Sequence, residues 1–194
     1  MKSPFSDYSL GAGLATDLVN TSALVRRSTG EVLVDTAALG RFLAEHHLAP
    51  AALPPSGRGP TGRDLEQVLA LRQEVRSLLE SADENVLADR ANALVERAGT
   101  RPVLERDADG HWQWFVAAGP GLADELAALI GTGLLGVLHT LSGERIRHCA
   151  SPVCDGMFVD TSKAGRRRYC TPGLCGNRLN VARHRARQLP EETG

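Results

Sequence analysis

The chain has 194 residues, of which 42% are hydrophobic and 23% charged, with a formal net charge of −1. A chain of this length can bury an apolar core without cross-links, and this composition excludes wholesale disorder. The start lacks the basic and apolar regions of a secretory signal, and no run of about 18 apolar residues follows. We therefore expect a soluble cytoplasmic protein.

The small net charge hides a division along the chain. Residues 1–144 carry 12 Lys and Arg against 19 Asp and Glu, a balance of −7, whereas residues 145–187 carry 10 against 2, a balance of +8. Such a division is typical of an acidic globular part joined to a basic part that binds a polyanion. The alternative is a basic surface that is only solvated.

The spacing of apolar residues predicts four helices in the first 97 residues. The helices are expected at 10–27, 36–47, 64–80 and 83–97. Asp35 is placed to cap the second helix, and the short stretch 32–34 before it should be extended. A Pro- and Gly-rich loop follows at 50–62.

Two further elements complete this part. Runs rich in β-branched and aromatic residues on either side of Asp109-Gly110 predict one β-hairpin over 101–117. Residues 122–141 are apolar on nearly all sides, which predicts the most buried helix. Three glycines each lower its helix propensity by about 1 kcal/mol relative to alanine, so we expect close helix packing there. They are Gly131, Gly133 and Gly136.

The four cysteines lie within 27 positions near the carboxyl end. They are Cys149, Cys154, Cys170 and Cys175. Two short-spaced pairs of thiolates can close a tetrahedron around zinc at Zn–S distances of about 2.3 Å, with no open position for catalysis. A disulfide is the alternative, but the reducing cytoplasm disfavours it. The pattern predicts one structural zinc ion.

The residues between and after the cysteine pairs predict a hairpin and a helix. Strands are expected at 157–161 and 166–170, with the tip at 163–165. Pro172-Gly173 should turn the chain into a final helix that begins near Cys175. A knuckle, a hairpin and a helix in this order are treble-clef-like.

The predicted fold class is mainly α (α+β). It comprises a helical amino-terminal domain with one β-hairpin and a small treble-clef-like zinc module at the carboxyl end. The expected boundaries are 1–144 for the helical domain, 145–190 for the zinc module and 191–194 for a tail.

The zinc module carries polar and basic side chains of the kinds that pair with phosphates and base edges. In the final helix an apolar stripe lies opposite a polar one, so that one face can pack while the other binds. The candidate nucleic-acid-binding residues are Lys163, Arg166, Arg167, Arg168, Asn177, Arg178, Asn180, Arg183, His184, Arg185 and Arg187. Alternatively, the arginine stems cover the zinc core and Asn177 caps the helix.

Several of these motifs resemble a known family. Cys175-Gly-Asn-Arg178, preceded by Asp160-Thr-Ser-Lys163 and Arg167-Arg-Tyr-Cys170, is similar to the CGNR zinc finger. Asp17-Leu-Val-Asn-Thr21, followed by Arg26 and Asp35, resembles the ABATE domain that accompanies this finger in bacterial proteins. The resemblance implies a transcription regulator whose finger binds DNA and whose helical domain senses a stress or small-molecule signal.

A ligand pocket in residues 1–144 is a further hypothesis. Its candidate ligand-binding residues are Asn20, Thr21, Arg26, Trp112 and Trp114, with Arg26 as the partner of an anion. Alternatively, Asn20 and Thr21 cap a helix, and the tryptophans serve the core or a dimer surface. We expect no enzyme, because we find no nucleophile with a plausible base, no Gly-rich phosphate loop and no second metal motif.

The leading hypothesis is a zinc-dependent regulator that binds double-stranded DNA. A short reading helix gives little specificity alone, so we expect a homodimer on two half-sites. The alternative is a zinc module that binds RNA or another protein without DNA specificity. Single-strand readers stack bases on aromatic side chains, and the module offers only Phe158 and Tyr169, which favours a duplex.

Overall fold

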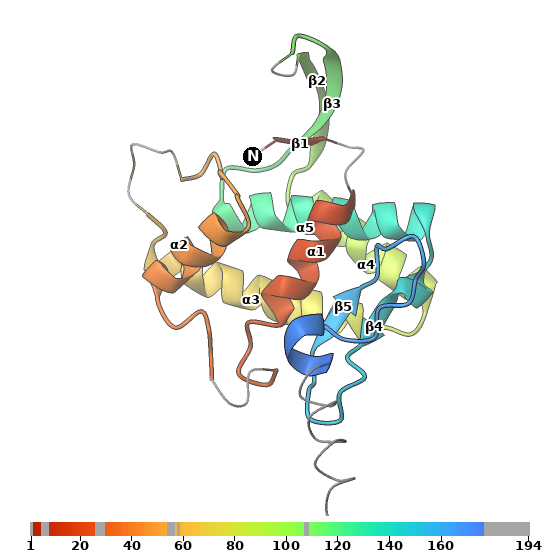
Figure 1. Cartoon of the computed structure of the whole chain (residues 1–194). Coiled ribbons are helices and arrows are strands. Elements are labelled where there is room, and N and C mark those ends of the chain that lie inside the picture. The colour runs from red at the N-terminus through yellow and green to blue at the C-terminus, as the bar shows by residue number, and fades with distance from the viewer. Residues whose placement is uncertain are drawn as a thin grey trace, which may run out of the picture.

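The structure is a computed structural model, and it describes residues 2–4, 8–25, 30–53, 57, 59–106 and 109–176. The helices in this part are α1 (Tyr8–Val19), α2 (Thr36–Glu45), α3 (Gly62–Leu79), α4 (Glu84–Arg97) and α5 (Leu122–Thr140). The strands are β1 (Lys2–Pro4), β2 (Arg101–Arg106), β3 (Trp112–Ala117), β4 (Ile146–His148) and β5 (Met157–Val159). The short turns Gly143–Arg145 and Pro172–Gly176 complete the elements. The fold is mainly helical, as the sequence predicts (Figure 1).

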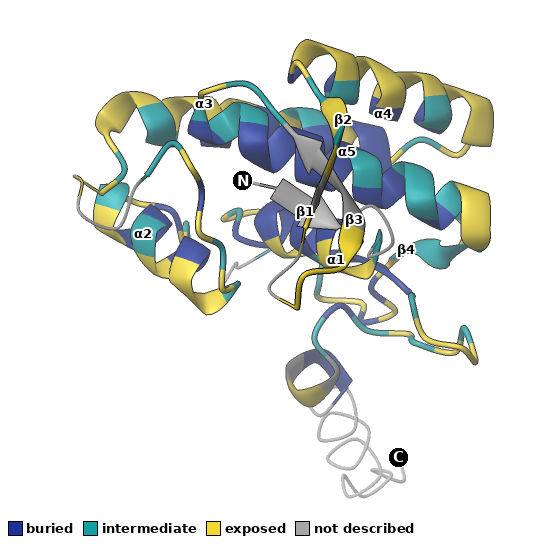
Figure 2. Ribbon diagram, turned by 90° about the horizontal axis from the view of Figure 1, so that it is seen from above, coloured by how far each residue is buried: buried dark blue, intermediate teal, exposed yellow. Residues whose placement is uncertain are grey.

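Helix α5 forms the centre of the fold. Helix α1 crosses it, and α3 and α4 lie along it (Figure 1). Seen from above, the buried faces of α3 and α5 meet in the middle while the outer faces of α2 and α4 are exposed (Figure 2). The composition of α5 would also suit a membrane span, but 61% of that stretch is buried inside the fold. This burial is what the core helix of a globular protein shows.

The close packing expected at the α5 glycines is confirmed. Helix α1 crosses α5 backbone to backbone, because a Cβ atom at Gly133 would lie only 2.6 Å from the Cα atom of Gly11. A Cβ atom at Gly131 would lie 2.6 Å from a methyl group of Val95 in α4. The glycines therefore set how near α1 and α4 come to α5.

Three helices start at a side-chain cap, and the cap predicted at Asp35 is confirmed. The carboxylate of Asp35 accepts a hydrogen bond from the Ala38 amide at 2.7 Å and caps α2. Thr61 and Asp64 form a capping box at the start of α3, and Asp83 caps α4. Each cap satisfies amide groups that have no partner within the helix.

Helix α1 is shorter than the predicted span 10–27, which was wrong at its end. It ends at Val19, and the hydroxyl of Thr21 donates to the Leu18 carbonyl at 2.6 Å. Asn, Thr and Ser side chains compete with the backbone for such bonds, and the run from 20 to 22 contains all three. The polar run ends the helix, although the apolar spacing continues to Val25.

The predicted β-hairpin is confirmed, and a third strand joins it. Strands β2 and β3 pair antiparallel, with Val103 opposite Phe115. The sequence does not single out β1, which pairs with the other edge of β3. The resulting sheet stands beyond α5, on the side away from β4 and β5 (Figure 1).

The glycine crossing can be tested by two substitutions in α1. In Gly11→Ala the new methyl group would collide with the carbonyl of Leu129, so we expect the free energy of unfolding to fall by about 2 kcal/mol or more. Gly13 has open space around it, and Gly13→Ala should be neutral or stabilise by about 0.5–1 kcal/mol. Urea denaturation measures both, and equal effects would contradict the close crossing.

Candidate metal centre

The four cysteine sulfurs converge on one point. The Sγ atom of Cys170 lies 3.6 Å from that of Cys154 and 3.7 Å from that of Cys175, and the Cys154–Cys175 distance is 3.8 Å. All four sulfurs, including that of Cys149, lie within 4.8 Å of one another. A zinc tetrahedron with bonds of about 2.3 Å has S–S edges of about 3.8 Å. The residues fit zinc.

A disulfide, the alternative from the sequence, is excluded for these cysteines. All four are free, and the S–S distances are far above the roughly 2.05 Å of a disulfide bond. The protein therefore holds one structural zinc ion at Cys149, Cys154, Cys170 and Cys175.

The first two ligands form a knuckle between β4 and β5. Cys149 follows β4, and its amide donates to the Gly156 carbonyl at 2.8 Å. The amide of Gly156 in turn donates to the sulfur of Cys154 at 3.4 Å. Cys175 lies in the turn Pro172–Gly176, where its amide donates to the Thr171 carbonyl at 2.8 Å. The N–H···S bond from Gly156 stabilises the Cys154 thiolate, and the two amide–carbonyl bonds fix the backbone that carries Cys149 and Cys175.

The predicted strand pairing within the module was wrong. Strand β5 pairs with β4, with Met157 opposite His148, and not with residues 166–170. Residues 166–170 run beside the knuckle, where the Arg168 carbonyl accepts from the Ala150 amide at 2.8 Å. Residues 146–148 were overlooked because three residues are too few to show a strand pattern.

The environment of Cys170 and Cys175 opposes ionisation of their thiols in the absence of a cation. Burial raises the pKa of Cys170 and of Cys175, and neighbouring thiolates raise it further. Burial also acts to raise the pKa of Cys149, but the amides of Cys170 and Ser151 outweigh it and hold that pKa below its usual value. A metal ion supplies the positive charge that four thiolates at these distances require.

Asp160 holds the loop that links the two ligand pairs, and the sequence did not mark it as a site residue. Its fully buried carboxylate accepts from the Ser162 hydroxyl at 2.5 Å and from the Arg167 amide at 2.8 Å. Burial acts to raise the pKa of Asp160, but these donors and Arg147 hold it below its ordinary value. The Arg145 guanidinium also donates to the Ser162 carbonyl, at 2.8 Å. The sequence signal that could have identified Asp160 as a site residue was the motif Asp160-Thr-Ser-Lys163.

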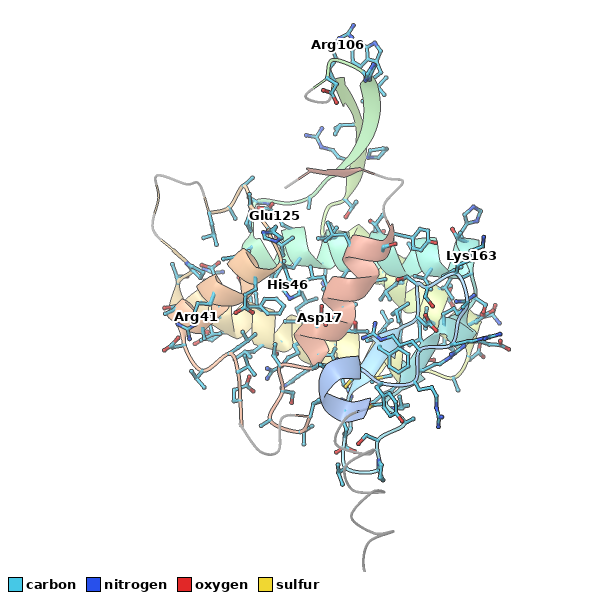
Figure 3. All side chains as sticks on the ribbon, viewed as in Figure 1. Asp17, Arg41, His46, Arg106, Glu125 and Lys163 are labelled. Atoms are coloured by element: carbon cyan, nitrogen blue, oxygen red, sulfur yellow. The ribbon has the colours of Figure 1, made fainter. Side chains whose placement is uncertain are left out.

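The candidate nucleic-acid-binding residues divide into two groups. Lys163, Arg166 and Arg168 are exposed, and Lys163 extends outward from the module (Figure 3). Arg167 faces inward, since its guanidinium lies 4.8 Å from the centre of the buried Phe158 ring and donates to the Tyr169 carbonyl at 3.0 Å. The others lie outside the described residues: Asn177, Arg178, Asn180, Arg183, His184, Arg185 and Arg187.

The candidate ligand-binding residues are not brought together in the described part of the chain. Asn20 and Thr21 are buried at the end of α1, next to the zinc module. Trp112 is 61% exposed on the hairpin, where Arg106 lies 4.6 Å from its ring centre (Figure 3). Arg26 and the side chain of Trp114 lie outside the described residues.

A cavity of about 120 Å³ lies where α1 ends against α3. Its lining residues are Val19, Ser22, Leu24, Arg72, Gln73 and Arg76. The Arg72 guanidinium bonds both oxygens of Glu31, at 2.6 and 2.8 Å, and donates to the Thr21 hydroxyl at 3.0 Å. This ion pair holds the pKa of Glu31 below its usual range.

Two family models match this chain. The model of the CGNR zinc finger matches residues 145–188. The ABATE model, described as "Putative stress-induced transcription regulator", matches residues 12–140. No curated protein gives a significant match.

The zinc ligands can be tested by Cys170→Ser. We expect zinc content to fall from one ion per chain to a small fraction, because a hydroxyl does not replace a thiolate. The whole chain should also lose stability, because Met157 and Val159 of β5 pack in the same core as the helices. Zinc content by metal analysis and thermal unfolding measure the two effects. A variant that retains one zinc would contradict the ligand assignment.

Proposed function

Because the chain belongs to the ABATE family and carries a CGNR zinc finger, we propose that it regulates transcription by binding double-stranded DNA through its zinc module. The proposal rests on one observation about the loop after β5, residues 160–169. Its basic side chains divide into those that bond the protein itself and those that are exposed to solvent. Structural arginines face inward and bond backbone carbonyls, while the remaining basic side chains face solvent.

The loop surface is basic for a structural reason. Residues 161–169 contain no acidic side chain, and the preceding Asp160 is fully buried. Arg145 and Arg147, which precede the loop, bond the carbonyls of Ser162 and Gly165, each at 2.8 Å, and so fix the loop. A fixed loop presents Lys163, Arg166 and Arg168 without a large ordering cost on binding, as a phosphate-binding surface requires.

The zinc ion supports this function without taking part in chemistry. Four thiolates leave no open coordination position, so the metal fixes the geometry of the module. We assign sequence selectivity to the final helix that the sequence predicts after Cys175, because its polar stripe carries Asn, His and Arg side chains. A homodimer on two half-sites remains our prediction for how such a small module gains specificity.

The proposal predicts different effects for neighbouring arginines. Duplex binding should weaken in each of three variants, Lys163→Ala, Arg166→Ala and Arg168→Ala. If each side chain neutralises one phosphate, the slope of log K against log salt concentration should become less steep by about 1 in each variant. Arg63→Ala, an exposed arginine on α3, is the matched control and should leave both unchanged. Arg167→Ala should instead destabilise the module.

The measurement is equilibrium binding of the zinc-loaded chain to a random duplex library over a range of salt. An enriched motif with a steep salt slope supports the proposal. Equal affinity for single-stranded RNA would favour the alternative of a module without DNA specificity. Wild-type salt slopes in all three variants would remove the loop from the interface.

We further propose that the cavity between α1 and α3 binds the small-molecule signal. Its volume is smaller than the roughly 150 Å³ of an apolar cavity that holds benzene, so the ligand must be small. Val19 and Leu24 give it an apolar wall, and Ser22 and Gln73 give it hydrogen-bonding groups. Because Glu31 already neutralises Arg72, a planar molecule with one polar group suits the site better than a strong anion.

A melting-temperature screen with small, neutral, planar molecules that carry one polar group, such as acetamide and pyrrole, tests the cavity. A compound that binds only the folded state raises the melting temperature by an amount that grows with the logarithm of its concentration above the dissociation constant. Ser22→Phe, which fills the cavity, should abolish the rise, and Ala44→Phe on the exposed face of α2 should keep it. A rise that survives in Ser22→Phe, or a panel without any stabilising compound, would contradict the proposal.

A further inference from the structure

We infer that Asn20 is a positioning residue of the zinc centre, through which the helical part controls zinc retention and zinc occupancy is transmitted back to α1. The inference rests on the proposed function only in its consequence for DNA binding. The contacts that carry it join the end of α1, the segment Asp155–Met157 and two of the ligand sulfurs.

Asn20 bonds the zinc module with both ends of its side chain. Its Nδ2 atom donates to the Met157 carbonyl at 2.7 Å, and its Oδ1 atom accepts from the Met157 amide at 3.0 Å. The two residues lie 137 positions apart, and Asn20 is only 5% exposed. The neighbouring Thr21 hydroxyl bonds the last turn of α1. The side-chain amide of Asn20 instead bonds the zinc module.

Gly156 lies between the Asn20 contact and two of the ligand sulfurs. A Cβ atom at Gly156 would lie 2.7 Å from the Cys170 sulfur, 3.2 Å from the Cys154 sulfur and 3.1 Å from Oδ1 of Asn20. One glycine backbone therefore separates Asn20 from two zinc ligands. A shift of Met157 relative to α1 would therefore change the position of Gly156 relative to both sulfurs.

A second helix holds the same segment. The guanidinium of Arg76 in α3 donates to the carbonyl of Asp155 at 2.9 Å, while its Nε atom bonds Glu80 at 2.6 Å. Arg76 also lines the cavity beside α1. Thus α1 holds Met157, α3 holds Asp155, and the residue between them touches the ligand sulfurs.

The module also shares the core of the helices. Met157 is 1% exposed and Val159 is 3% exposed, and both pack in the main hydrophobic cluster with α1 and α5. An arrangement that ties metal ligands to a hydrophobic core couples the two free energies, and such coupling is reciprocal. Zinc binding should stabilise the end of α1, and a disturbed α1 should bind zinc less tightly.

For the proposed regulator, this coupling means that zinc loss and a signal in the helical part both act on the contact of α1 and α3 with the segment Asp155–Met157. A ligand in the cavity would contact Arg76 and the end of α1, the two elements that hold the segment Asp155–Met157. The DNA-binding state of the loop after β5 would then depend on both.

The test compares zinc affinity of full-length variants by competition with a colorimetric zinc chelator. Loss of a group that supports metal ligands typically costs 10–100-fold in affinity, and we expect a loss in this range for Asn20→Ala. Thr16→Ala is the matched control. Thr16 is equally buried in α1, but its hydroxyl bonds the Gly13 carbonyl of its own helix at 2.9 Å. It should bind zinc as the wild type does.

Asn20→Asp keeps the inference falsifiable if Asn20→Ala does not fold. It retains the acceptor for the Met157 amide but loses the donor, and it adds negative charge near two thiolates, so its zinc affinity should also fall. Hydrogen exchange gives the reciprocal readout, because zinc should protect amides at the end of α1 in the wild type and less so in the folded variant. Zinc affinity like that of Thr16→Ala in both variants would overturn the inference. Failure of DNA binding with the zinc effect intact would overturn only the proposed function.

Discussion

The backbone crossing of α1 over α5 at Gly11 and Gly133 determines where α1 ends and where the zinc module lies on the helical part. Because neither residue has a side chain, α1 approaches α5 closely enough to bury its whole inner face, including Leu14 and Leu18. The direction of the crossing then sets where α1 ends, and at that end Asn20 meets Met157. The position of the zinc module on the helical part thus follows from a contact at the opposite end of the same helix.

Charge is organised by burial as much as by sequence position. Arg72 and Asp160 are both buried, and each bonds several groups that would otherwise be unpaired. Inward-facing arginines satisfy backbone carbonyls where the chain makes no regular structure, as buried polar groups require. The surface of the loop after β5 is basic because its acidic residue Asp160 is buried, while Lys163, Arg166 and Arg168 are exposed.

Much of the fold could be predicted from the sequence, because its signals are local. Asp35 marks a helix start by its chemistry, and the spacing of the cysteines marks the metal site. The role of Asn20 could not be predicted, since its partner is a backbone group far along the chain. The pairing of β5 with β4 was missed for a similar reason, because register between short strands depends on tertiary packing. Arg167 could not be told from Arg168 in a run of three arginines, although Phe158 lies beneath the former.

Met157 and Val159 connect the metal centre to the apolar core. Both side chains leave water only when β5 lies against the helices, and β5 is held in place by the knuckle whose cysteines bind zinc. A chain made during metal shortage would expose apolar surface, and such surface is what chaperones and proteases detect. The amount of folded protein would then follow the availability of zinc.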